Sequence, residues 1–147
     1  HQSIYARKIL QIYGSWDQPS VKTPLEAGTR LSKVDSPSYV DPALHCRYRG
    51  ITGHLSFLVT MTRCDLAFAY VELSKFVQAP GEVHLKAAER VLQYLRCTFE
   101  LGLTYSDLGP ERLNILQGWM DSDYASDPDT RKSVTGYVLS LNNAPVF

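Results

Sequence analysis

The chain has 147 residues, of which 44% are hydrophobic and 20% charged, and its formal net charge is zero. A chain of this length and composition can form an ordinary domain with a buried core. Because the net charge is zero, any nucleic-acid binding must come from local patches rather than from a global attraction. No apolar run approaches the roughly 18 residues of a membrane span, and no signal peptide opens the chain, so we expect no membrane partner.

The three cysteines, Cys46, Cys64 and Cys97, are odd in number, widely spaced and without a C-x-x-C pair. This spacing does not favour a disulfide framework or a zinc ribbon. We therefore expect reduced thiols and an intracellular location, cytoplasmic or nuclear. The chain begins with His1 rather than Met, from which we expect a fragment, a processed product or an excised domain.

The first elements along the chain are predicted to be helical. Residues 4–13 predict a short amphipathic helix that ends at Gly14, a common C-terminal helix signal. Residues 14–44 contain several Pro, Ser, Asp and Gly residues, which predict a crossing segment with little regular structure. The mostly apolar stretch over 48–77 predicts two helices, with residues 60–65 between them.

Residues 82–96 form the clearest predicted helix. Its acidic start and basic end suit the helix dipole. His84 lies beside the apolar stripe, and we interpret it as a packing or hydrogen-bonding histidine. The stripe recurs every four residues, at Val83, Ala87, Val91 and Leu95.

The last third of the chain is predicted to be β. Residues 101–105 predict a short strand, and residues 114–124 and 133–141 predict stronger ones. A turn at 142–143 precedes a final apolar segment, 144–147. Helical patterns first and strand patterns second predict an α+β fold.

Asp121 and Asp123 stand two residues apart in a predicted strand, where residues i and i+2 point to the same face. Paired carboxylates suit hard divalent cations, and two-metal nucleases use such ions for phosphodiester chemistry. The residues alone also allow solvated acids at a turn. A calcium-binding EF-hand loop starting at Asp121 is excluded, because Ser126 stands where it needs Gly and Lys132 where it needs Glu.

The stretch around these acids resembles the start of the RNase H domain in the polyprotein of copia-type LTR retrotransposons. That family reads roughly G-Y-S-D-A-D-W-A-G-D-x-D-x-R-K-S-T-S-G-Y-V. The matching residues are Asp121, Asp123, Ala125, Asp127, Asp129, Arg131, Lys132, Ser133, Gly136, Tyr137 and Val138.

Upstream segments resemble the same family in the same order over essentially the whole chain. Residues 48–55 resemble Y-R-x-[LIV]-x-G-x-L, and residues 62–69 resemble T-R-P-D-[IL]-x-[FY]-A. Residues 73–95 are similar to L-S-[RK]-F…P…H-x-x-A-x-[KR]-[VI]-L-x-Y-L. Cys64 replaces the family's proline and Cys97 replaces a glycine, which suggests an ageing copy.

The resemblance implies a reverse-transcriptase thumb/connection-like helical region over 1–110, followed over 111–147 by the opening antiparallel strands of an incomplete RNase H-like domain. In the parent polyprotein it implies RNA-directed DNA synthesis on a template–primer and hydrolysis of the RNA strand of an RNA–DNA hybrid. Asp121 is the implied catalytic and metal-binding carboxylate for Mg²⁺, with Asp123 as a second candidate. The polymerase Tyr-x-Asp-Asp and the later RNase H carboxylates are missing from these residues, so we expect them to be catalytically silent and to bind Mg²⁺ weakly.

Cations of the helical region are candidate contacts to a nucleic-acid backbone. For each of them an ordinary solvated or ion-paired surface remains an open alternative. The candidates are Arg47, Arg49, Lys86 and Arg90.

Two other functions remain open. One is a helical module co-opted for protein or nucleic-acid binding. The other is a small metal-dependent nuclease built around Asp121 and Asp123, which would need further carboxylates in the same pocket. We also expect self-association through the exposed β edge, over residues 133–147, because unpaired strand edges pair with other chains.

Overall fold

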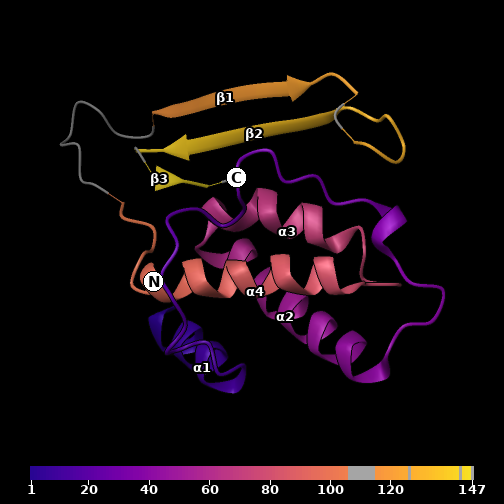
Figure 1. The fold of residues 1–147 in the computed structure, drawn as a ribbon. Coiled ribbons are helices and arrows are strands. Elements are labelled where there is room, and N and C mark those ends of the chain that lie inside the picture. Colours follow the sequence, from indigo (N-terminus) through magenta and orange to yellow (C-terminus); the bar gives the residue numbers. More distant parts are fainter. Residues whose placement is uncertain (106–114, 126, 143, 147) are drawn as a thin grey trace. The chain divides into compact units, whose positions relative to one another are not determined.

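The computed structural model describes residues 1–105, 115–125, 127–142 and 144–146. The chain divides into two units, His1–Gly102, here the helical unit, and Leu103–Phe147, here the strand unit. Among the described residues every α-helix lies in the former and every β-strand in the latter (Figure 1). The predicted α+β class is therefore confirmed, whereas the assignment of 1–110 and 111–147 to two enzyme regions stays a prediction.

Helix α1 spans Ser3–Ile12 and ends where the sequence predicts. After it the N–H of Gly14 donates to the carbonyl of Gln11 at 3.2 Å, and the N–H of Ser15 donates to that of Leu10 at 2.9 Å. This is a Schellman motif, which needs a left-handed residue after the helix. Gly14 supplies it with φ of 64°, a conformation that a side chain disfavours. The helix buries Ala6, Ile9 and Leu10.

Helix α2 spans Pro42–Met61 and begins inside the segment predicted to lack regular structure. Pro42 occupies the first turn, where its missing N–H costs nothing. The Asp41 carboxylate caps the helix by accepting the N–H of Leu44 at 3.0 Å. The prediction for 14–44 is thus wrong at its C-terminal end, because a capping acid followed by proline starts a helix. Before α2 the described helices of that segment comprise one 3₁₀ turn, Lys33–Asp35.

The predicted interruption after α2 is confirmed. A 3₁₀ turn, Cys64–Leu66, leads into helix α3, Ala67–Ser74. Helix α4, Glu82–Cys97, then follows the prediction for 82–96 within one residue at its end. Its buried residues are His84, Ala88, Val91, Leu92 and Leu95, whereas Val83 at the head of the predicted stripe is 47% exposed.

His84 is the packing and hydrogen-bonding histidine that the sequence predicts. It is buried, and its Nδ1 accepts the N–H of Gly81 at 2.8 Å, which caps α4. Its Nε2 lies 3.1 Å from the carbonyl oxygen of Ser32. The ring also stacks on Phe76, with centroids 4.1 Å apart. His84 therefore joins the crossing segment to the start of α4.

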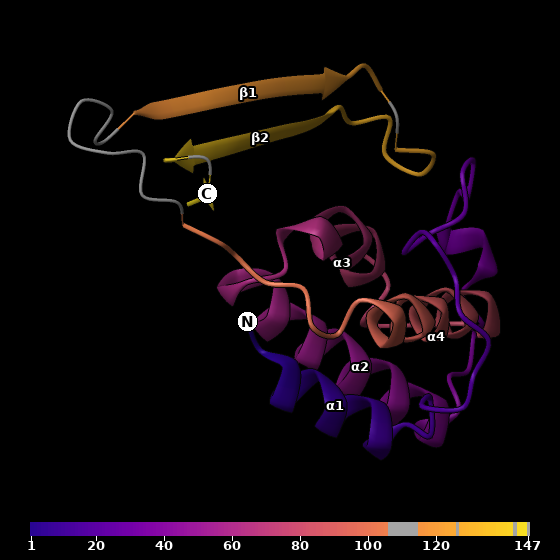
Figure 2. The same cartoon turned by 90° about the vertical axis from the view of Figure 1, so that its left-hand side faces the viewer.

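The core of the helical unit forms around α4, which contacts α1, α2 and α3 (Figure 2). Tyr48 is buried in this core, and its hydroxyl donates to the carbonyl of Leu73 at 2.7 Å. Burial raises the pKa of Tyr48 far above its ordinary value, so the phenol stays neutral. Other members are Leu10, Ile51, Leu55, Leu58, Leu66, Leu92 and Leu95.

The strand unit holds an antiparallel sheet of order β1-β2-β3. Its strands are β1, Leu116–Asp123, β2, Val134–Leu141, and the short β3, Ala144–Pro145. The register places Leu116 opposite Leu141 and Asp123 opposite Val134. The two stronger predicted strands are confirmed.

The strand predicted over 101–105 is wrong, since those residues form none. The N–H of Leu101 instead donates to the carbonyl of Thr98 at 2.9 Å and closes a turn after α4. A strand needs a neighbouring strand for its hydrogen bonds, and the described strands pair only with one another. A local propensity for β structure was therefore not enough to form a strand over 101–105.

Candidate metal and nucleic-acid sites

Strand β1 carries both candidate metal-binding carboxylates. Because residues i and i+2 of a strand point to the same face, Asp121 and Asp123 lie on one face of the hairpin, and both are exposed. Asp121 lies opposite Gly136, where an added Cβ would meet no atom within 4 Å. There is thus open space across the strand from Asp121. One of its oxygens, Oδ1, accepts the N–H of Ser122 at 2.9 Å.

These two acids do not by themselves build a metal centre. Among the described residues, no three His, Cys, Asp or Glu side chains are grouped so that they could hold an ion. Mg²⁺ demands six ligands in near-octahedral geometry and usually takes one or two of them from protein carboxylates. Asp121 and Asp123 could supply that minimum, with water or substrate oxygens completing the shell.

The acidic loop between β1 and β2 is organised by Asp127. Its Oδ1 accepts the N–H of Asp129 at 3.0 Å, the N–H of Thr130 at 2.7 Å and the hydroxyl of Thr130 at 2.9 Å. The N–H of Arg131, a residue with φ of 56°, donates to the Asp127 carbonyl at 3.0 Å. Asp127 is only 9% exposed. Among the family-matching acids, Asp127 therefore holds the loop in shape rather than facing solvent.

Two of the four candidate nucleic-acid-binding cations are engaged within the helical unit. The Nε of Arg47 donates to Glu89 at 2.9 Å, and its Nη2 donates to the carbonyl of Tyr13 at 3.2 Å. The Arg47 guanidinium also lies 5.4 Å from the ring centroid of Tyr13. Arg90 pairs with Glu26 at 3.1 Å. Both cations join α4 to other segments, so a phosphate would have to compete with these carboxylates.

Arg49 on α2 and Lys86 on α4 are both exposed. Within the part of the chain that the structure describes, neither has an ion-pair partner. They are therefore better placed than Arg47 and Arg90 to meet a phosphate, although the contact itself stays a prediction.

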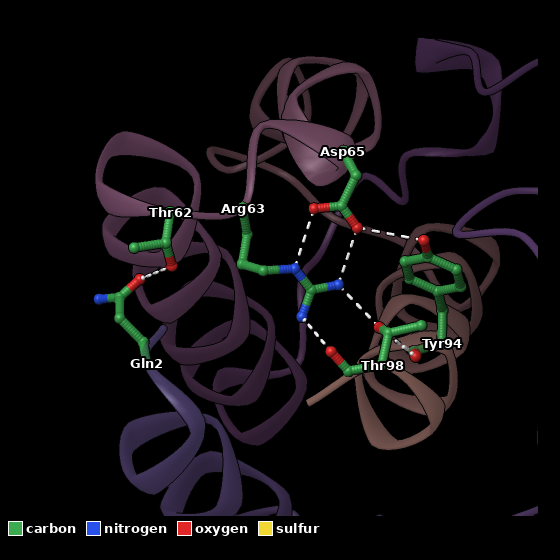
Figure 3. Close-up of polar contacts among 6 residues, drawn as sticks. All are labelled: Gln2, Thr62, Arg63, Asp65, Tyr94 and Thr98. Carbon is green, nitrogen blue, oxygen red and sulfur yellow. Dashed lines mark hydrogen bonds and ion pairs between the residues drawn. The ribbon is translucent and has the colours of Figure 1, made fainter. Parts of the chain in front are cut away.

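Arg63 forms a buried polar cluster that sequence reasoning missed (Figure 3). Its side chain is 2% exposed. Its Nε and Nη2 donate to the two carboxylate oxygens of Asp65, at 2.9 and 2.8 Å. Its Nη1 donates to the carbonyl of Thr98 at 2.9 Å, and Nη2 also donates to the Thr98 hydroxyl at 2.7 Å. The signal in the sequence is the Arg-x-Asp spacing just before α3, which permits this bidentate pair.

The surroundings of Asp65 keep it ionised. Burial by itself would raise its pKa, but the hydrogen bonds and charge of Arg63 and the hydroxyl of Tyr94, 3.1 Å away, lower it. The net result is a pKa below the ordinary value. Nearby, the Thr62 hydroxyl donates to Gln2 at 2.8 Å and ties the end of α2 to the start of α1 (Figure 3). These hydrogen bonds hold the helix ends together, and the described residues of the cluster include no unpaired reactive group.

No protein-family model matches the chain, and no solved structure matches it. Curated sequences do. The chain is 32% identical over 148 aligned positions to the retrovirus-related Pol polyprotein from transposon TNT 1-94 of Nicotiana tabacum, covering 99% of the chain and 11% of that protein. It is 35% identical over 126 positions to the Pol polyprotein from transposon RE1 of Arabidopsis thaliana, covering 86% of the chain and 8% of that protein. The chain belongs to the family of copia-type retrotransposon Pol polyproteins.

The resemblance stated from the motifs is thereby confirmed at the level of the Pol polyprotein family. The chain spans about a tenth of the length of these two Pol polyproteins. It is also 37% identical over 99 residues to Secreted RxLR effector protein 161 of Plasmopara viticola, covering 67% of the chain and 68% of that protein. None of the described helices is both long and apolar enough to cross a bilayer.

Proposed function

We propose that this part of a copia-type Pol polyprotein joins a reverse-transcriptase thumb/connection region, residues 1–110, to the first strands of an RNase H-like domain, residues 111–147. Three observations support the proposal. The chain belongs to the Pol polyprotein family, its motifs follow the order of that family, and helices precede an antiparallel hairpin in the structure. In the parent polyprotein the joined regions would serve RNA-directed DNA synthesis and hydrolysis of the RNA strand.

The observation that carries the proposal is the position of Asp121 on β1. A strand holds a carboxylate more firmly than a loop does, and the glycine opposite leaves space beside it. Asp121 would hold Mg²⁺, with Asp123 two residues along the same face as a second oxygen donor. When bound, such ions activate water and stabilise the leaving oxygen of a phosphodiester. The chain's own contribution is to place negatively charged oxygens where the RNA backbone and the ion meet.

Alone, these 147 residues should bind divalent ions weakly, because their described part gathers two carboxylates rather than a full ligand set. Paramagnetic broadening by Mn²⁺ in NMR spectra tests this directly. Amide signals of Asp121 and Asp123 should broaden at millimolar Mn²⁺, and Asp121→Asn should abolish the effect. The matched control is Asp17→Asn, which changes an exposed acid of the helical unit. If these signals do not broaden, or if they broaden equally in Asp121→Asn, Asp121 does not bind the metal ion.

Catalysis provides a second measurement. We expect no cleavage of an RNA–DNA hybrid and no primer extension by the purified chain with Mg²⁺ or Mn²⁺. Hybrid cleavage that disappears in Asp121→Asn and survives in Asp17→Asn would contradict catalytic silence and establish the small-nuclease alternative.

A second candidate function, a co-opted binding module, is favoured by one comparison. The chain covers 68% of an effector protein that carries no Pol name, and the described residues of the hydrophobic core cluster all belong to the helical unit. If the bound partner is nucleic acid, Arg49 and Lys86 are the cations that would contact its phosphates.

Fluorescence anisotropy with a labelled RNA–DNA duplex, measured at several salt concentrations, tests that candidate. The double variant Arg49→Gln/Lys86→Gln should weaken binding and reduce the slope of log K against log salt by about two, one for each lost phosphate contact. The control, Lys22→Gln/Arg30→Gln, removes two exposed cations of the crossing segment. Equal effects of the two double variants would show that binding is only non-specific attraction.

A further inference from the structure

The guanidinium of Arg90 on α4 has one hydrogen-bonding side that is poorly satisfied. Its Nη1 pairs with the Glu26 carboxylate at 3.1 Å. Its Nη2 lies 3.4 Å from the hydroxyl oxygen of Thr23, which is longer than the usual hydrogen bond. Its Nε is shielded from solvent, and no described residue accepts a hydrogen bond from it. A shielded donor without an acceptor is costly, so a stronger acceptor on this side would be stabilising.

Nε and Nη2 form the side of an arginine that can hold two oxygens of one group. Arg63 uses these two nitrogens for the two carboxylate oxygens of Asp65, at 2.9 and 2.8 Å. On the same side of Arg90, the described residues supply only the neutral hydroxyl of Thr23. A phosphoryl group on that hydroxyl would bring charged oxygens to both nitrogens, which is the geometry that arginine binds best.

Thr23 has the surroundings that a phosphorylated residue needs. It is exposed and precedes Pro24, and a threonine before a proline is the dipeptide that proline-directed protein kinases accept. It also lines a groove of about 430 Å³, so there is space beside it for a phosphoryl group. Thr23 and Arg90 both belong to the helical unit, and their contact therefore does not depend on where the strand unit lies.

The carboxylates near Thr23 leave room for a further negative charge. Glu26 and Asp65 line the same groove as Thr23. Asp65 is already paired with Arg63 at 2.8 Å. The Glu26 side chain is 70% exposed, so it can move into water when a phosphate with a charge of about −1.5 to −2 takes its place. Arg90 would then exchange a solvent-screened carboxylate for a stronger acceptor.

We propose that Thr23 is a phosphorylation site and that Arg90 holds its phosphate, which fixes the crossing segment on α4. A protein kinase transfers the group from a nucleoside triphosphate. The bond from Thr23 Oγ1 to the γ-phosphorus forms, the bond from that phosphorus to the leaving nucleoside diphosphate breaks, and the hydroxyl proton passes to the kinase. Phosphorylation also withdraws Arg90 from the candidate contacts to a nucleic-acid backbone. This inference goes beyond the proposed function and does not depend on metal binding by Asp121.

Phosphothreonine encoded genetically at position 23 of the intact chain tests the contact by NMR. The Arg90 Nε–H signal should shift, and the proton affinity of the phosphate should fall about threefold or more, which places its second pKa below the usual value of about 6. Arg90→Gln should restore the usual value, whereas Lys22→Gln, the matched loss of an exposed cation beside Thr23, should change it less. Phosphothreonine at position 29, another exposed threonine of the crossing segment, should leave the Arg90 signal in place.

A kinase assay tests whether the folded chain accepts the modification. With a proline-directed protein kinase and ATP, the intact chain should gain phosphate at Thr23, and Thr23→Ala should lose it. The internal comparison is Ser36, the other hydroxyl residue that precedes a proline, which is half-buried. A folded chain that is modified only at Ser36, or at neither residue, would overturn the proposal. So would a phosphate at position 23 whose pKa is the same with Arg90 and with Arg90→Gln.

Discussion

The helical and strand units satisfy their backbone hydrogen bonds in different ways, and the difference separates the packed core from the candidate site. Each helix of the helical unit makes its hydrogen bonds internally and needs neighbours only for its apolar stripe. That stripe is buried in all four helices, with Leu55, Leu73 and Leu95 fully inaccessible. Strand β1, by contrast, has no buried residue, because a hairpin covers neither of its own faces.

This difference matters because the candidate catalytic carboxylates lie on the unit that we expect to be less stable. An isolated hairpin is marginally stable in water, whereas a packed helical core resists unfolding as a unit. Asp121 and Asp123 are therefore presented by an element whose order depends on further pairing or cover.

The largest expected effect is a contrast in amide hydrogen exchange. Amides of residues 83–95 in α4 should exchange about a thousand times more slowly than those of residues 133–141, as expected for a difference of about 4 kcal/mol in opening free energy. The measurement is exchange monitored by NMR or mass spectrometry at a concentration where the chain is monomeric. Equal protection of the two segments would show that the strand unit is as stable as the helical unit.

A cavity in the helical core should cost nearly as much. Leu95 is fully buried on α4, so Leu95→Ala should reduce the free energy of unfolding by about 2–5 kcal/mol. The control within the same unit is Leu101→Ala, which truncates a leucine that is 51% exposed and should cost under about 0.5 kcal/mol. Chemical denaturation followed by circular dichroism measures both. Similar losses for the two variants would place the core elsewhere.

Removing the buried cation of the polar cluster should have the next largest effect. Arg63→Met removes the guanidinium donors from the Thr98 carbonyl and leaves the Asp65 carboxylate with the Tyr94 hydroxyl but without its cation. We therefore expect a loss of about 3 kcal/mol, the lower end for a broken buried pair, because Asp65 is one-third exposed. Arg49→Met, at an exposed position of α2, should change stability little. If the two variants unfold at the same denaturant concentration, the cluster does not stabilise the helical unit.

The smallest predicted effect is on the pH dependence of stability. The pKa of Asp65 is lowered in the folded chain, so the unfolded state binds its proton more readily. The resulting stabilisation is fully present above the ordinary value of 3.8 and is lost as the pH falls through the lower folded value. The stability difference between the native chain and Asp65→Asn should therefore narrow below pH 3.8. A difference that is constant from pH 6 down to pH 2 would contradict this assignment.

Local signals in the sequence predicted much of the fold. The stop at Gly14 follows from the left-handed conformation that a Schellman motif requires, and α4 follows from apolar residues repeating at helical spacing. The alternation of β1 placed Asp121 and Asp123 on one face. The strand predicted at 101–105 failed because strands depend on partners distant in the sequence. The start of α2 was missed because Pro42 was interpreted as a breaker rather than as a first-turn residue.

Side-chain partnerships across the helical unit could not be predicted in the same way. Arg47 and Arg90 have the sequence appearance of solvated cations, yet they pair with Glu89 and Glu26, which lie far away along the chain. Their availability to phosphate is reduced by contacts that exist only after the helices pack. Arg63 shows the same effect more strongly, because its burial depends on the end of α4 lying against the turn that follows α2.

The sequence by itself determined the family, the division into helices followed by strands, and the positions of the candidate carboxylates, because short-range periodicity and capping depend on residues a few positions apart. Only the tertiary structure decided which cations are paired and that Arg63 is buried in a polar cluster with the end of α4. Those properties arise from contacts between residues far apart in the chain, whose geometry no local pattern encodes.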